Sequence, residues 1–238
     1  MTLVYRCRQV IGKLGRRQAN TLRRAQGAAH GSRYHYWLIP DPPMSSLTRR
    51  LARRLLTLAG WKVMYRAPAT KKAVIVFYPH TSNWDFVIGI LVRSAIRLPV
   101  RFAAKDTLFA WPLGAVFRRL GGIPVNRRER TGFVTQMAAE FRRRDEFYLA
   151  ITPEGTRRLT PGWKSGFYRL ALEAGVPLGL AFIDYARREI GVVDYLTLVG
   201  DEEADFQHIR QNYAGRLGRH PAQQAPIALL ATEKRDNA

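Results

Sequence analysis

Residues 73–85 read AVIVFYPHTSNWD, an apolar run of strand length that is followed at once by a polar loop containing a histidine. Such a short apolar run cannot span a bilayer and is typical of a strand buried in a parallel sheet. In open α/β sheets, ligands bind at the carboxyl ends of the strands. Since His80 follows the strand directly, this stretch predicts both an α/β fold and the place of its functional site.

Strand-like and helix-like segments alternate on both sides of this stretch, as they do in α/β proteins. Strands are expected at 73–78, 100–104, 123–125, 146–151, 176–183 and 190–199, and helices at 83–96, 112–120, 131–143, 166–174 and 202–217. We therefore predict an α/β fold with a mixed, mostly parallel sheet flanked by helices. The chain shows no internal repeat.

A basic amphipathic helix is expected before the sheet, from Ser46 to Gly60. At 100° per residue its leucines share one face and its arginines the opposite arc: Leu47, Leu51, Leu55 and Leu58 against Arg49, Arg50, Arg53 and Arg54. One interpretation places the helix in the headgroup layer of an anionic membrane. The other packs its leucine stripe on the protein's own core and leaves the arginines in solvent.

The net charge of the chain is strongly positive and unevenly distributed. Thirty-nine Lys and Arg residues against 18 acidic residues give +21, and residues 1–66 alone carry 14 basic residues and a single acid. Such an excess attracts nucleic acid, anionic lipid or phosphorylated small molecules. Cys7 is the only cysteine, which excludes an internal disulfide, and the His and Cys spacings do not resemble a zinc site.

The organisation we predict is a single folded domain with extensions at both ends. Residues 1–43 lack periodic apolar positions and are expected to form a poorly ordered basic extension. The domain would cover residues 44–220, and residues 221–238 would form a loose C-terminal tail. None of the apolar runs is long enough to span a bilayer.

His80 and Asp85 are the first candidate site residues. On one continuous helix, residues five apart point about 140° away from each other. His80, however, lies in the loop before the helix, so Asp85 in the first turn can reach an imidazole nitrogen and fix the tautomer of a general base. Alternatively, Asp85 only complements the helix dipole and His80 is an ordinary loop residue. We interpret Ser82 as a helix cap rather than a nucleophile.

Two further loops follow strands and carry arginines. The first, residues 152–158 (TPEGTRR), brings Glu154, Gly155, Thr156 and Arg157 together. Arginine forks match the geometry of phosphate oxygens, whereas the alternative is a surface turn with an ion pair.

The second of these loops is residues 121–127 (GGIPVNR), whose tight turn and short strand deliver Arg127 to the same sheet edge. The alternative there is a solvated run of charges.

In their order and spacing these blocks resemble the glycerolipid acyltransferase family, which acylates glycerol phosphate and lysophospholipids. That family has a His and an Asp separated by four residues, a Gly-x-x-aromatic-aliphatic-Asp-Arg block, a Phe-Pro-Glu-Gly-Thr-Arg-Ser block, and a strand rich in Val and Pro. The matching positions, which span about residues 74–182, are His80 with Asp85, Gly121 with Val125 and Arg127, residues 153–157, and residues 176–178.

The chain departs from the family pattern beside these positions. The departing residues are Pro79, Pro124, Asn126, Thr152, Arg158 and Leu180. They spare the His and Asp and both arginines, but they leave the identity of the acceptor open.

The resemblance implies an O-acyltransferase of the 1-acylglycerol-3-phosphate type, with its acyltransferase domain at 44–220. His80 would take the proton of an acceptor hydroxyl, which attacks a thioester carried on coenzyme A or acyl carrier protein, while Asp85 orients His80. Neither a metal nor a cofactor is implied. The residues that the resemblance places around the acceptor's phosphate are Arg127, Arg157, Glu154, Gly155 and Thr156, with Lys105 as a further anion contact.

The expected partners are a lysophospholipid or glycerol-phosphate acceptor, the thioester donor and an anionic membrane surface. We expect the protein to be peripheral on the cytoplasmic face of the cell membrane and to bind no nucleic acid. One alternative is a basic nucleic-acid-binding protein that uses Tyr34, Tyr36 and Trp37 for stacking. Another is a catalytically silent lipid-binding relative, which the intact His80 and Asp85 disfavour.

Overall fold

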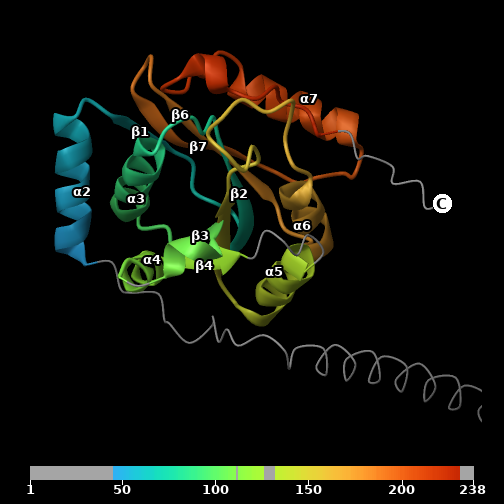
Figure 1. Cartoon of the computed structure of the whole chain (residues 1–238), viewed down its shortest axis with the longest axis horizontal. Coiled ribbons are helices and arrows are strands. Elements are labelled where there is room, and N and C mark those ends of the chain that lie inside the picture. Colours follow the sequence, from blue (N-terminus) through green and yellow to red (C-terminus); the bar gives the residue numbers. More distant parts are fainter. Residues whose placement is uncertain (1–44, 111, 126–131, 231–238) are drawn as a thin grey trace, which may run out of the picture. The chain divides into compact units, whose positions relative to one another are not determined.

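The computed structural model describes residues 45–110, 112–125 and 132–230, which build one sheet covered by helices on both faces (Figure 1). Its seven strands lie in the order β1-β7-β6-β2-β5-β3-β4. Every neighbouring pair is parallel except β6 and β7. The predicted α/β fold with a mixed, mostly parallel sheet is confirmed.

The strands and helices lie close to the expected positions. The strands are β1 (Lys62–Tyr65), β2 (Lys72–Tyr78), β3 (Val100–Lys105), β4 (Gly122–Val125), β5 (Phe147–Ile151), β6 (Leu178–Asp184) and β7 (Glu189–Leu196). The helices are α2 (Ser46–Leu58), α3 (Trp84–Ile96), α4 (Gly114–Arg119), α5 (Gly132–Arg143), α6 (Gly166–Ala174) and α7 (Glu202–Tyr213), with short 3-10 turns η2 (Asp106–Phe109) and η3 (Pro221–Gln223). Among the strands and α-helices of the described residues, only β1 was not expected, because this four-residue strand at the sheet edge is largely exposed and has no apolar run.

The central strand β2 divides its side chains between two cores. Val74, Val76 and Tyr78 pack with α5, α6 and α7 on one face of the sheet. Ala73 and Ile75 point to the opposite face, where α3 lies. This alternation follows from the two-residue period of a strand and leaves β2 buried on both sides.

The order of the strands places the ends of β6, β2 and β5 side by side. Val76 of β2 is in register with Ile151 of β5, and Tyr78 of β2 with Phe182 of β6. Since all three strands run in the same direction, the loops that follow them meet at one edge of the sheet. That edge therefore holds the loop of His80, the arginine-containing loop after β5, and the β6–β7 turn.

Helix α2 docks on the protein in an orientation that differs from one of the two interpretations. Its buried residues are Ala52 and Leu56, and it packs against α3. The leucine stripe is exposed instead, with relative accessibilities of 44–84% for Leu47, Leu51, Leu55 and Leu58. The interpretation in which this stripe packs on the core is therefore wrong.

The C-terminal segment is more ordered than the sequence suggests. Residues 221–230, predicted to be loose, pack against the domain: Ala225 is buried, and Trp163 pairs through its backbone with Ala228 and Leu230. This part of the prediction is wrong. The segment is held by backbone hydrogen bonds, and a pattern of apolar residues does not reveal such bonds. The extension predicted at 1–43 and the rest of the tail, 231–238, lie outside the described residues.

Within the described ranges, every helix is too short or too polar to cross a bilayer.

Candidate active site

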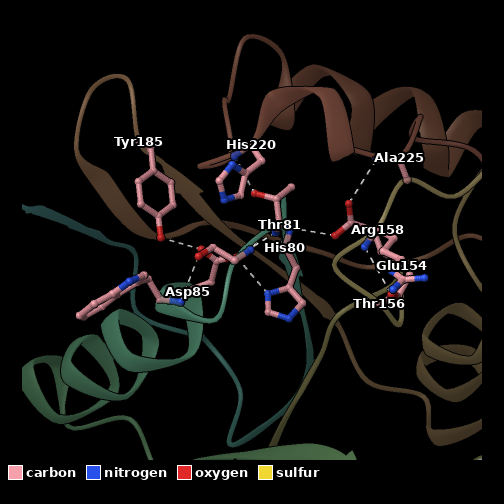
Figure 2. Close-up of polar contacts among 11 residues, drawn as sticks. His80, Thr81, Asp85, Glu154, Thr156, Arg158, Tyr185, His220 and Ala225 are labelled. Atoms are coloured by element: carbon pink, nitrogen blue, oxygen red, sulfur yellow. Dashed lines mark hydrogen bonds and ion pairs between the residues drawn. The ribbon is translucent and has the colours of Figure 1, made fainter.

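His80 and Asp85 meet at the carboxyl end of β2. The Nδ1 atom of His80 lies 3.1 Å from Oδ2 of Asp85, which stands in the first turn of α3 (Figure 2). The loop between β2 and α3 turns the imidazole back towards the helix, as the sequence suggested. With Nδ1 occupied by the carboxylate, Nε2 is the ring nitrogen left to accept a proton from a substrate.

The Asp85 carboxylate is buried and held by several donors. Its Oδ2 atom accepts hydrogen bonds of 2.9 Å from the backbone N–H groups of Thr81 and Ser82. Its Oδ1 atom accepts a 2.7 Å bond from the hydroxyl of Tyr185. Burying a carboxylate is costly unless hydrogen bonds replace its water, and here they do. The carboxylate is thereby fixed in the plane from which it contacts His80.

Tyr185 is a member of this site that the sequence did not reveal. It lies 100 residues from Asp85, in the turn after β6. Burial raises the pKa of its phenol above the ordinary value, and the hydrogen bond to Asp85 raises that pKa further. The hydroxyl therefore remains protonated and donates.

The hydroxyl of Ser82 contacts the start of α3. Its Oγ atom accepts a 3.2 Å hydrogen bond from the backbone N–H of Trp84, the first residue of the helix. This contact satisfies one of the free N–H groups in the first turn. The N-cap position itself belongs to Asn83, whose side chain makes no capping hydrogen bond, so Ser82 supports the helix start from the residue before the cap.

Glu154 holds the loop of His80 by hydrogen bonds to the backbone. Its Oε2 atom accepts a 2.8 Å bond from the backbone N–H of His80, and its Oε1 atom a 3.2 Å bond from that of Ala225. Burial raises the pKa of Glu154 to about 7, the negative charge of Asp85 adds to this rise, and the two N–H donors oppose it. Glu154 therefore anchors two backbone N–H groups, and it does not line the large cavity beside His80.

A large cavity of about 720 Å³ opens beside His80, between α3 and the sheet. Its polar residues include His80, Lys105, Thr156 and Arg157. The rest of the lining is mostly apolar and comes from α3, β3 and the central strands: Ile75, Phe86, Ile90, Ile96, Val100, Phe102, Ala181 and Val192. The cavity therefore joins a polar group near the histidine to an apolar interior.

The loop after β5 brings its predicted residues to the large cavity. Gly155, Thr156 and Arg157 all line it, as Lys105 does from the end of β3. Gly155 has a φ of +66°, and a Cβ there would approach Nζ of Lys164 to 3.0 Å, so the turn requires glycine. Arg127 lies outside the described residues.

Residues 62–179, which include the His80–Asp85 pair and the β5 loop, match the family model described as Acyltransferase. Among solved structures, the fold is similar to the 1-acyl-sn-glycerophosphate (LPA) acyltransferase PlsC from Thermotoga maritima, with a TM-score of 0.48 and 16% sequence identity. The match covers 74% of this chain and 81% of that one. A search of the curated proteins finds no match.

Proposed function

Residues 62–179 form a domain of the acyltransferase family, and from this premise we propose that the chain transfers a fatty acyl group from a thioester to the hydroxyl of a lysophospholipid or glycerol-phosphate acceptor. The observation that carries the proposal is the position of His80. Its imidazole is backed by a buried carboxylate and lies at the polar part of an otherwise apolar cavity. This position supports a role for His80 as the proton acceptor, between an apolar region for a hydrocarbon chain and a polar region for the acceptor.

The reaction we propose uses His80 as general base. Nε2 takes the proton of the acceptor hydroxyl as its oxygen attacks the thioester carbonyl. The tetrahedral intermediate collapses with cleavage of the carbon–sulfur bond, and the imidazolium returns the proton to the leaving thiolate. Asp85, bonded to Nδ1, stabilises the imidazolium and holds the ring in position. The products are the ester and the free thiol, and an acyl-enzyme is not required.

The large cavity would hold the acyl chain of the donor, which is carried on coenzyme A or acyl carrier protein. Its interior presents aliphatic and aromatic side chains from α3 and the sheet. Each methylene buried there contributes about 0.8 kcal/mol. With the chain bound between α3 and the sheet, the thioester carbonyl would lie near His80.

The phosphate of the acceptor would bind at the polar part of the large cavity. Arg157 and Lys105 bring positive charge there from the ends of β5 and β3. We assign Arg127 the same role on the basis of the family motif alone. Guanidinium groups bind phosphate oxygens with two parallel hydrogen bonds, which fixes orientation as well as charge.

We also propose that the protein attaches to the cytoplasmic face of the cell membrane through α2. The exposed leucines of this helix and its arginines Arg50, Arg53 and Arg54 form a surface of mixed apolar and cationic character. Such helices lie in the headgroup layer of anionic membranes. Further large apolar side chains are exposed on α3, η2 and α4: Trp84, Val87, Leu108, Leu113 and Val116.

The test is an acyl-transfer assay on the purified protein, with a panel of lysophospholipids and glycerol 3-phosphate as acceptors and acyl-CoA or acyl carrier protein as donors. Wild type should form the acylated product, and His80→Ala should lose at least about a hundredfold in rate, as expected for a general base. His208→Ala, an exposed histidine on α7, is the matched control and should keep full activity. Transfer by wild type that survives undiminished in His80→Ala would refute the mechanism.

A further inference from the structure

A second hollow, of about 340 Å³, lies between α2 and α3, and we call it the α2–α3 groove. Its walls are apolar side chains of the two helices together with Trp61, Trp84 and Tyr185. The charged residues that line it are Arg188 and Arg219, both exposed to solvent. It is therefore an apolar groove with a cationic rim.

Helix α3 separates this groove from the large cavity. Trp84, Ile88 and Leu91 face the groove, whereas Phe86 and Ile90 face the large cavity. Such a division follows from the helical period, which turns successive residues to different sides. Two apolar sites thus lie on the two sides of one helix, and the Asp85 carboxylate that contacts His80 stands at the start of that helix.

The groove reaches the loop of His80 through two contacts. Tyr185, whose ring lines the groove, donates its hydroxyl proton to Asp85. Arg219 precedes His220, whose backbone N–H donates a 3.1 Å bond to Oγ1 of Thr81, next to His80. A molecule in the groove would therefore have its polar end close to the histidine.

The two arginines of the rim contact an aromatic ring and a carbonyl oxygen. The guanidinium of Arg219 lies 5.9 Å from the ring centroid of Trp84, and Nη1 of Arg188 donates a 3.1 Å bond to the carbonyl of Ala59. Among the described residues, no ion pair joins either arginine to a carboxylate. The apolar walls fit a single hydrocarbon chain, and the positive charge of the rim favours a molecule of net negative charge, even where its phosphate binds elsewhere.

We propose that the α2–α3 groove holds the hydrocarbon chain that the acceptor lysophospholipid already carries, an inference that rests on the function proposed above. The product has two chains on one glycerol, and the large cavity is assigned to the chain of the donor. The second chain needs an apolar site of its own within reach of His80. The α2–α3 groove is such a site.

The order of the strands agrees with this arrangement. Tyr185 follows β6, His80 follows β2 and Arg157 follows β5, and these strands are neighbours in that order. In a 1-acylglycerol phosphate, the free hydroxyl is on the carbon between the acyl ester and the phosphate. A chain in the groove and a phosphate at Arg157 would place that hydroxyl at His80, between them.

The experiment fills the groove and compares acceptors of different chain length, with oleoyl-CoA as donor. In Ala59→Phe and in Leu55→Trp, the KM for oleoyl lysophosphatidate should rise at least about tenfold, whereas the KM for hexanoyl lysophosphatidate should change less than about twofold because a short chain needs little of the groove. The matched control is Leu172→Trp, an equal enlargement at an exposed leucine of α6 that lines neither the groove nor the large cavity. It should change neither KM.

A second control separates the two apolar sites. Gly89 lines the large cavity, and a Cβ there meets nothing within 4 Å, so Gly89→Leu should extend into free space on that side of α3. It should reduce the use of long-chain donors relative to short ones and leave the acceptor preference unchanged. Melting curves identify a filled variant that fails to fold. The comparison of acceptor chain lengths then rests on the other filled variant.

The possible failures can be told apart. If wild type transfers no acyl chain to any acceptor, the proposed function is wrong. If wild type is active but the filled variants keep the wild-type preference for oleoyl over hexanoyl acceptors, the inference about the groove is overturned. It is overturned as well if Leu172→Trp raises the KM for the oleoyl acceptor as much as the filled variants do, because that result would reflect a general effect of an added tryptophan rather than a specific site.

Discussion

The hydroxyl of Tyr185 donates a 2.7 Å hydrogen bond to Oδ1 of Asp85, the carboxylate oxygen opposite the one that contacts His80. The carboxylate is thus held between a histidine from one loop and a tyrosine from another. Because Tyr185 approaches from the β6–β7 turn, the orientation of Asp85 depends on that turn as well as on α3. We regard Tyr185 as a positioning residue for the proposed general base.

Tyr185→Phe should lower kcat by about tenfold or more with little change in KM, because a hydrogen bond to a buried charged group is typically worth about 1.5–3 kcal/mol. The matched control is Tyr168→Phe, which removes an equivalent 2.8 Å bond from a tyrosine to the buried Asp205, away from the site. That variant should lose melting temperature but keep kcat. Equal kcat values for the two variants would remove Tyr185 from the site.

Glu154 should make the stability of the protein depend on pH between about 4.5 and 7. Its pKa is raised from 4.5 to about 7 in the folded protein, so over this range the unfolded chain has lost the proton that the folded protein still binds. Stability therefore falls as pH rises through this range, by at most about 3 kcal/mol from this group.

Glu154→Gln should remove that pH dependence, although it also weakens the backbone contacts of the carboxylate. Denaturant unfolding at pH 5 and pH 7.5 measures the effect in both proteins. The fall in free energy of unfolding between these pH values should be smaller in the variant. An identical fall in both proteins would mean that Glu154 has an ordinary pKa.

Arg157→Ala should raise the KM for a phosphate-bearing acceptor by about tenfold or more, since a charge-assisted hydrogen bond is lost. Arg158 is the neighbouring control: it is also exposed but does not line the large cavity. Arg158→Ala should change that KM less than about twofold, because surface charges contribute little. Steady-state kinetics with both variants decide, and a similar rise in both would indicate only a general effect of positive charge.

Membrane attachment through α2 should be partly electrostatic. Replacing Arg50, Arg53 and Arg54 by Gln should weaken binding to anionic vesicles by about 1 kcal/mol per charge and reduce its dependence on salt. Leu51→Ser should weaken binding at every salt concentration, whereas Leu172→Ser, an exposed leucine on α6, should not. Cosedimentation with vesicles measures these effects, and equal binding of wild type to neutral and anionic vesicles would argue against the proposal.

The parts of the site that are local in the chain could be predicted from the sequence. An apolar strand, a histidine directly after it and a helix start a few residues later fix His80 near Asp85 without long-range information. The loop after β5 could be placed at the same edge for a similar reason, because parallel strands of one sheet end together. Lys105, which ends β3, was suggested by the resemblance to the family and not by this argument.

The parts that depend on contacts between distant segments could not be predicted. Tyr185 and Ala225 reach Asp85 and Glu154 across 100 and 71 residues, and neither position has a local motif. The buried face of α2 was missed for a related reason. Helical periodicity identifies the leucine stripe, but only the tertiary packing shows that the helix docks through Ala52 and Leu56 instead.

The segment after α7 braces the loop of His80. Ala225 accepts a 2.8 Å bond from the hydroxyl of Tyr78 and donates to Glu154, which in turn holds the backbone of His80. A nonsense codon shortly after position 218 would encode a polypeptide that keeps the seven described strands and the His80–Asp85 pair. It would nevertheless lack this brace, so a frameshift after α7 cannot be regarded as silent.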